Sequence, residues 1–199
     1  PVQSRRPDVQ PKEFLQELRR ITEATGTALI FDEIVTGLRS HPGGAQALFQ
    51  VRADIATYGK VLGGGMPIGA VTGRGAYMDA IDGGMWSYGD NSYPRAEQMF
   101  FAGTFCKHPL AMAAARAVLT HLKEHGPSLQ QRLNERTTRL AGELNAFFSR
   151  EQLTLNAGHF GSLLYFIPAQ RMEALDLFFY HLIEKGVYKL AVAQEDRHV

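Results

Sequence analysis

The sequence has very little cysteine: Cys106 is the single one among 199 residues. One cysteine allows no internal disulfide, and this favours a reducing, cytoplasmic setting. No uninterrupted apolar run is long enough to span a bilayer, and the start of the chain lacks the apolar segment of a signal peptide. Charge is balanced, with 21 Lys and Arg against 20 Asp and Glu. We therefore expect neither a nucleic acid nor a membrane as partner.

The sequence also lacks the signatures of metal sites and of repeat proteins. His, Cys, Asp and Glu show no spacing typical of a metal site, so we expect no metal and interpret Cys106 and His108 as structural. The chain has no internal repeat and no low-complexity tract. It also has no initiator methionine, and we expect it to be part of a longer polypeptide or a processed product.

What is present is typical of a packed α/β protein, because 45% of the residues are hydrophobic. Apolar residues at helical spacing from Phe14 to Ile21, with Gly26 as a stop, predict a helix. Three short apolar runs read as strands: 28–35, 53–59 and 68–73. Helix and strands with glycine-rich connections predict an α/β layer over the first half of the chain.

The second half reads differently. Pro109 at the start, an alanine-rich interior and Gly126 at the end predict a helix over 109–126, and a second helix follows Pro127. A hairpin is predicted over 153–167 and a last helix over 171–186. We therefore divide the chain into a large-domain part, a connecting helix and a smaller α+β domain: 1–108, 109–126 and 127–199.

The run LIFDEIV places an acid in an apolar strand. Strand side chains alternate between faces, so Asp32 and Ile34 point the same way and Glu33 points the other way. Burying a carboxylate is costly without a partner, and taken alone Asp32 reads as a strand-end residue that bonds nearby backbone N–H groups. Lys60, taken alone, reads as a surface lysine in a glycine-rich loop.

Taken together, these residues form a more specific pattern. Asp32, then Lys60 in YGKVLGGG, then FAGTFCKHPLAMAA (101–114) follow in this order. The ordered set resembles the class III aminotransferases, which use pyridoxal phosphate and have the type I fold. Within that class the chain is similar to the glutamate-1-semialdehyde aminotransferase group. The segments WSYGDNSYP (86–94) and FFAGTFCKHPLA (100–111) resemble the amine-transferring domains of mixed polyketide and peptide synthases.

The resemblance implies roles around the cofactor ring. Lys60 would form the Schiff base with the cofactor, helped by burial in an apolar site, which lowers the pKa of a lysine. Asp32 would pair with the pyridine nitrogen and keep it protonated, so that the ring accepts electrons. Ile34 would press against the ring. The glycines of 63–65 would allow a tight backbone path beside the cofactor.

The resemblance also implies a phosphate contact. Gly103 and Thr104 precede the helix that begins near Pro109, and backbone N–H groups near a helix start suit a phosphate. The matching threonine of the family reaches the cofactor held by the partner subunit, so a homodimer with shared active sites is implied. Family members are longer at the N-terminus, where they supply a glycine-containing phosphate loop and a ring-stacking aromatic, and the segment 189–199 differs from their usual continuation.

Three functions follow from this reading. The first is an aminotransferase that moves an amino group from an amino-acid donor to a keto or aldehyde acceptor. In a synthase context the acceptor would be a carrier-bound β-keto acyl chain, with an acyl carrier protein domain as partner. The second is a glutamate-1-semialdehyde 2,1-aminomutase, an isomerase on the same scaffold. The third is a non-catalytic remnant that acts as a dimerisation module.

Overall fold

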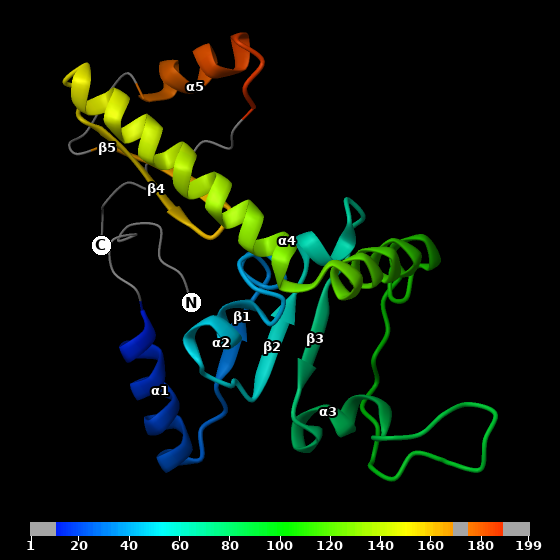
Figure 1. The fold of residues 1–199 in the computed structure, drawn as a ribbon. Helices are drawn as coiled ribbons and strands as arrows, with labels where there is room; N and C mark the ends of the chain where they lie inside the picture. Colours follow the sequence, from blue (N-terminus) through cyan, green and yellow to red (C-terminus); the bar gives the residue numbers. More distant parts are fainter. Residues whose placement is uncertain (1–10, 169–174, 189–199) are drawn as a thin grey trace.

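The structure, a computed structural model, describes residues 11–168 and 175–188 (Figure 1). Its centre is a three-stranded sheet in the order β1-β2-β3: β1 (Ile30–Asp32), β2 (Ile55–Tyr58) and β3 (Ala70–Gly73). The first pair is parallel, with Asp32 opposite Thr57, and the second pair is antiparallel. The three predicted strands are present, and each is shorter than its apolar run.

Helix α1 (Lys12–Thr25) confirms the first predicted helix, and Gly26 ends it with a left-handed φ of 67°. That conformation suits glycine because it has no Cβ. The short elements α2 (Gly44–Phe49), η1 (Lys60–Gly63) and α3 (Gly75–Asp82) were not predicted. Helix α2 fills the connection between the two parallel strands, as a crossover requires.

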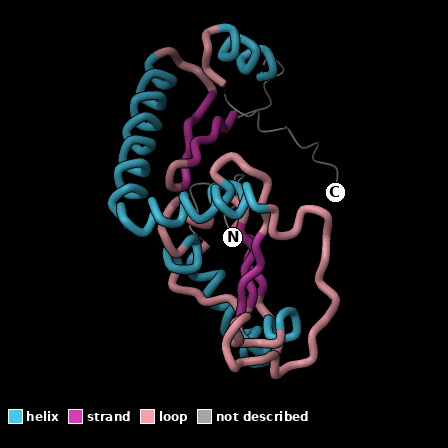
Figure 2. Tube along the Cα trace, turned by 90° about the vertical axis from the view of Figure 1, so that its right-hand side faces the viewer, coloured by secondary structure: helices cyan, strands magenta, loops and turns pink. Residues whose placement is uncertain are grey.

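Helix α4 (Pro109–Arg150) leaves the sheet domain and runs past it as the longest element (Figures 1 and 2). Its backbone is non-helical at Gly126, with φ 50° and ψ −154°, immediately before Pro127. A proline cannot donate to the preceding turn, so the helix breaks there. The predicted end of one helix at Gly126 and the start of another at Pro127 are therefore confirmed as a kink.

The predicted hairpin is also confirmed, as β4 (Leu155–Phe160) paired antiparallel with β5 (Leu163–Pro168). It lies along the second half of α4 in both ribbon views (Figures 1 and 2). Helix α5 (Leu175–Glu184) follows. The first residues of its predicted range, 171–174, lie outside the described residues.

Two clusters of buried side chains hold these elements together. One joins α1, α2 and the sheet and includes Phe160 from the hairpin, which stacks on Phe49 at 5.9 Å between ring centroids. The other joins α4, the hairpin and α5 around Phe148. The division of the chain at 108 and 126 stays a prediction.

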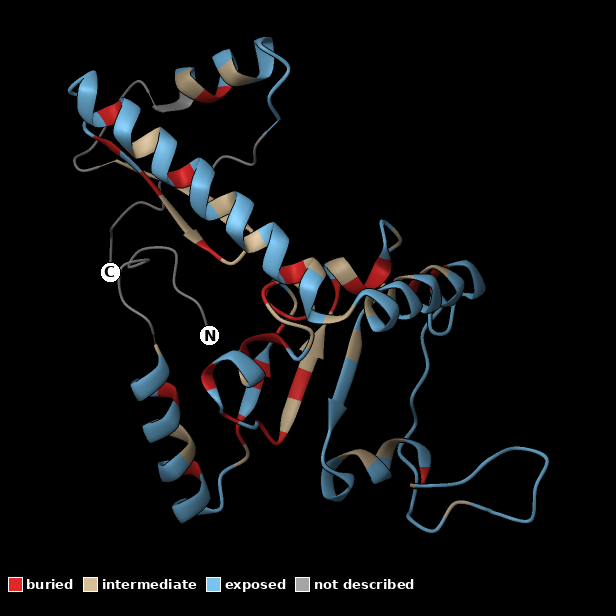
Figure 3. Ribbon diagram, in the orientation of Figure 1, coloured by how far each residue is buried: buried red, intermediate tan, exposed pale blue. Residues whose placement is uncertain are grey.

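Only one face of the sheet is covered by the described residues. Phe31 is buried, whereas Ile30 is 59% exposed and Asp32 is exposed (Figure 3). The apolar run 28–35, which is typical of a buried strand, is therefore buried on only one face in the described chain. The outer face of β3 is open as well, since Val71 is 54% exposed.

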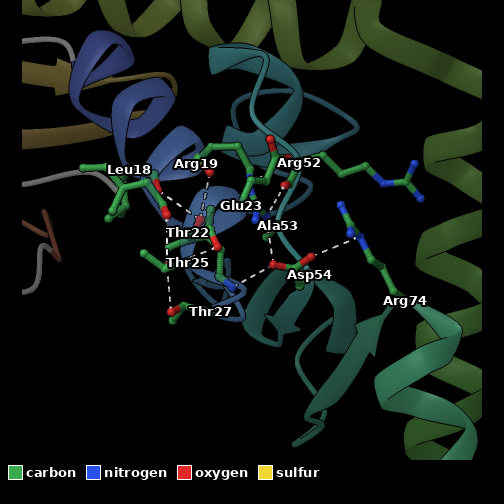
Figure 4. Close-up of polar contacts among 12 residues, drawn as sticks. Leu18, Arg19, Thr22, Glu23, Thr25, Thr27, Arg52, Ala53, Asp54 and Arg74 are labelled. Carbon is green, nitrogen blue, oxygen red and sulfur yellow. Dashed lines mark hydrogen bonds and ion pairs between the residues drawn. The ribbon is translucent and has the colours of Figure 1, made fainter.

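An ion cluster fixes the far end of the sheet, where β2 begins (Figure 4). Asp54 is buried and accepts hydrogen bonds from the backbone N–H of Leu29 and from Arg19 of α1, each at 2.8 Å. Its other oxygen faces Nε of Arg74 at 3.0 Å. The Leu29 N–H first, and Arg19 second, hold the pKa of Asp54 below its ordinary value. One carboxylate thus joins α1, both parallel strands and the start of α3.

Candidate functional site

The two residues proposed for the chemistry lie at the same edge of the sheet. Asp32 ends β1, and Lys60 follows the end of the parallel neighbour β2. The Oδ1 atom of Asp32 accepts hydrogen bonds from the backbone N–H of Ile34 at 2.9 Å and from the Thr57 hydroxyl at 3.4 Å. Asp32 therefore bonds nearby backbone, as expected for a strand-end acid, and its Oδ2 has no partner among the described residues.

Lys60 sits on unusual backbone. Its φ is 45°, in the left-handed region, and it follows Gly59 in an extended conformation. Such a conformation costs a residue with a Cβ about 1–2 kcal/mol and is over-represented at functional sites. Lys60 is exposed in the described chain. The apolar enclosure expected around it is therefore not supplied by the described residues.

Ile34 reaches this edge by a route other than the predicted one. The strand ends at Asp32, and Ile34 lies in the following turn, so strand alternation does not position it. Its Cγ2 atom lies 3.5 Å from where a Cβ on Gly59 would sit. Ile34 is half-buried and packs over Gly59, the residue directly before Lys60.

Glu33 was correctly kept out of the predicted chemistry, but its structural role was missed. Its side chain is 0% exposed and lies on the inner side, opposite Asp32. It accepts hydrogen bonds from the backbone N–H of Ala45 at 3.0 Å and of Gln46 at 2.9 Å, and a short one from the Thr36 hydroxyl. A buried carboxylate at the start of α2 satisfies N–H groups that have no partner within the helix.

The triple glycine has a different neighbour from the expected one. A Cβ on Gly63 would lie 3.0 Å from Cγ2 of Ile68, and one on Gly64 would lie 2.7 Å from Cγ2 of Val118. The glycine loop therefore packs closely on Ile68, which follows it in the chain, and on Val118 of α4. Gly65 has nothing within 4 Å of that position. Gly63 thus packs on Ile68 and Gly64 on α4, and a role of these glycines beside a cofactor stays a prediction.

Gly103 and Thr104 lie in an exposed turn before α4, closed by a hydrogen bond from the Cys106 N–H to the Gly103 carbonyl at 3.0 Å. Among the described residues, no hydrogen bond or ion pair joins this turn to Asp32 or Lys60. Asp32, Ile34 and Lys60 thus come from the ends of neighbouring strands, whereas Gly103 and Thr104 come from the turn before α4.

The described residues contain no group of three or more His, Cys, Asp or Glu side chains that could hold a metal ion. Nor is any helix within 11–168 and 175–188 long and apolar enough to cross a membrane. A lysine and a carboxylate lie at the carboxyl ends of neighbouring parallel strands, the place where open α/β sheets commonly bind ligands.

Comparison with known proteins shows which family of α/β proteins this chain resembles. The model of the family "Aminotransferase class-III" matches residues 1–195. A glutamate-1-semialdehyde 2,1-aminomutase from Alkaliphilus oremlandii is 36% identical over 98% of this chain and 44% of its own length. One from Lachnoclostridium phytofermentans is 35% identical over 98% of this chain and 45% of its own length.

Solved structures agree with these matches. An ω-transaminase from Sphaerobacter thermophilus superposes with a TM-score of 0.73 at 30% identity, covering 89% of this chain and 41% of that one. A transaminase with PLP bound gives a TM-score of 0.76 at 27% identity, with the same coverage. The chain belongs to the class III aminotransferase family. Its fold is part of the type I fold, as predicted, and it spans less than half the length of these relatives.

Proposed function

We propose that the protein containing this chain is a pyridoxal-phosphate-dependent aminotransferase, which moves an amino group from an amino-acid donor to a keto or aldehyde acceptor. The observation that carries the proposal is the position of Lys60 and Asp32 at adjoining strand ends in a class III chain. A family match alone would fit an inactive relative equally well. The two chemical groups in one place argue for activity.

The residues at this edge fit the cofactor. Pyridoxal phosphate, when bound, supplies an aldehyde that holds an amine and a ring that accepts electrons from the neighbouring carbon. Lys60 would bind the aldehyde and, once an amino substrate has replaced it, move a proton between the substrate carbon and the cofactor carbon. The free Oδ2 of Asp32 would accept the ring N–H, and Ile34 would cover the ring.

We further propose that Gly103 and Thr104 serve the site of a second subunit, so that the protein is a homodimer. Their exposure in a turn before α4 supports a contact in trans. The surrounding segment, 85–112, is largely exposed and carries many apolar side chains, which supports a role as an interaction surface. The most exposed are Met85, Tyr88, Phe100 and Phe105.

Two reactions remain candidates on this scaffold. The segments at 86–94 and 100–111 support a synthase-type aminotransferase that acts on a carrier-bound β-keto acyl chain, with an acyl carrier protein domain as partner. The names of the two aminomutase relatives favour instead a transfer within one molecule, as in glutamate-1-semialdehyde. A cytoplasmic location, favoured by the single cysteine, stays a prediction.

The test uses the full-length protein loaded with pyridoxal phosphate. An aminotransferase converts each amino donor to its keto acid and stops when the donor or the acceptor is left out. An aminomutase consumes glutamate-1-semialdehyde without any donor. A folded protein that binds no cofactor and catalyses neither reaction would identify the third candidate, a dimerisation module, and would overturn the proposal.

A further inference from the structure

Glu33 begins a chain of polar contacts that reaches both strand ends of the candidate site. It follows Asp32 directly, and its own backbone N–H donates to the carbonyl of Thr57 at 2.9 Å, which extends the β1–β2 pairing by one step. Its carboxylate is held by two backbone N–H groups of α2 and by Thr36. Removing a buried carboxylate from such contacts leaves several donors unsatisfied, so the group is firmly fixed.

The backbone around this carboxylate is shaped to receive it. Gly44 has a φ of 68°, and a Cβ there would lie 2.6–2.8 Å from the carboxylate atoms of Glu33. Gly37 donates its N–H to the Glu33 carbonyl at 2.8 Å. A Cβ on Gly37 would lie 2.7 Å from the ring of Tyr58. Two glycines therefore let the loop close tightly on Glu33 and on the last residue of β2.

Gln46 carries the contacts from Glu33 to the second strand. Its backbone N–H is bound by Glu33, and its side-chain oxygen accepts the N–H of Ala53 at 2.9 Å, just before β2. Its side-chain nitrogen donates to the Tyr58 hydroxyl at 3.3 Å, at the end of β2. Burial first, and the negative charge of Glu33 second, raise the pKa of Tyr58 above its ordinary value. That charge effect agrees with the closeness of the two side chains.

We propose that Glu33 is a positioning residue for the reaction: through Gln46 and Tyr58 it sets the relative placement of Asp32 and Lys60. The inference rests on the proposed function. Asp32 adjoins Glu33 in the chain, and Lys60 lies two residues beyond Tyr58. The contacts of one buried carboxylate therefore hold the backbone next to both residues. A misplacement of about 1 Å in such a pair costs an enzyme up to about a hundredfold in rate.

The test compares three variants of the full-length protein loaded with pyridoxal phosphate. Glu33→Gln keeps the shape of the side chain and removes its charge. Tyr58→Phe removes only the hydroxyl that Gln46 reaches. Glu135→Gln, on the exposed surface of α4, is the matched control. The readouts are kcat and KM, and the pH midpoint at which the absorbance of the cofactor bound to Lys60 changes.

We expect Glu33→Gln and Tyr58→Phe to lower kcat by about tenfold to a hundredfold, with little change in KM, as for groups that act on geometry rather than on substrate affinity. The absorbance midpoint should shift in both, because the placement of Asp32 relative to Lys60 changes. Glu135→Gln should match the parent in both readouts. A role in stability alone would lower the unfolding midpoint and leave kcat and the absorbance midpoint of the folded protein unchanged.

The outcomes separate the two proposals. Should Glu33→Gln fail to fold, Tyr58→Phe decides, because it changes one hydroxyl at a half-buried position. A folded Tyr58→Phe protein with parental kcat and parental absorbance midpoint would overturn the positioning role while the proposed function stands. If the parent itself shows no cofactor bound at Lys60, the proposed function fails, and the positioning role fails with it.

Discussion

The carboxylate of Asp54 should carry an unusually large share of the stability of the sheet domain. Substituting Asp54→Ala removes the acceptor for the Leu29 N–H and for Arg19, whose side chain is only 12% exposed. The Arg74 pair is half exposed, and such a pair contributes at most about 1 kcal/mol. Losing the pair with Arg19 is the larger effect, because breaking a buried pair costs about 3–5 kcal/mol. Arg19 keeps Glu23 at 3.1 Å and the Arg52 carbonyl at 3.3 Å, so we expect a loss at the lower end of that range.

Substituting Asp54→Asn should cost less, about 1–3 kcal/mol, because the amide oxygen can still accept the Leu29 N–H but the charge is lost. The pKa of Asp54 is lowered by folding, so its contribution is complete above the unfolded-state pKa and disappears as the pH falls through the folded-state pKa. The difference between the parent and Asp54→Asn should therefore be constant at neutral pH and shrink below about pH 4.

The assay is urea unfolding of the full-length protein, followed by circular dichroism between pH 7 and pH 3. Glu17→Gln is the control, since Glu17 forms an exposed pair with Arg20 within α1 and should leave stability nearly unchanged. A loss of less than 1 kcal/mol in Asp54→Ala, or a parent–Asn difference that does not change with pH, would show that the cluster in Figure 4 does not hold the sheet domain together.

Three further outcomes are expected. Asp32→Asn should keep cofactor binding and lower turnover by several orders of magnitude, because a charge-assisted hydrogen bond to the ring nitrogen is lost; near-parental turnover would exclude this role. Gly64→Ala should lower stability by about 2–3 kcal/mol, since the φ of Gly64 is 56° and a methyl of Val118 in α4 lies 2.7 Å from the new Cβ. Gly65→Ala is the control, because its new Cβ meets no atom within 4 Å and adds only backbone strain. Equal losses of stability in the two variants would refute the packing argument. Mixing Lys60→Ala and Thr104→Ala proteins should restore part of the activity, because one site of the mixed dimer carries neither defect; no recovery despite proven subunit exchange would refute a shared site.

Local signals were sufficient for the long elements. The spacing of apolar residues, with Gly26 as a stop, predicted α1, and Pro109, Gly126 and Pro127 predicted both the start of α4 and its kink. These features depend on residues a turn or two apart, which a sequence displays directly. The hairpin from β4 to β5 was predicted for the same reason.

Elements that depend on distant partners were missed. Helix α2 is six residues long, and its first N–H groups are satisfied by Glu33, twelve and thirteen residues earlier in the chain. Strand alternation correctly turned Glu33 away from Asp32, but nothing nearby in the sequence indicated the helix that Glu33 would meet. A buried acid followed by a Gly-Gly pair was the available signal.

The candidate site was predicted in part. Asp32 and Lys60 do lie at neighbouring strand ends, because parallel pairing aligns the two runs that precede them. The packing of Gly64 on α4 was not predicted, since its close neighbour, Val118, is far away in sequence. The apolar enclosure predicted around Lys60 is also not found in the described chain. The described residues cover only one face of the sheet and leave Lys60 exposed.

The central claim is that Lys60 holds the cofactor. The most direct measurement is borohydride reduction of the full-length protein loaded with pyridoxal phosphate, followed by digestion and mass spectrometry of the labelled peptide. The account predicts one reduced cofactor per chain, attached to Lys60, and no label in Lys60→Ala. A reduced cofactor on Lys107 or Lys123, or a folded protein that takes up none, would contradict it.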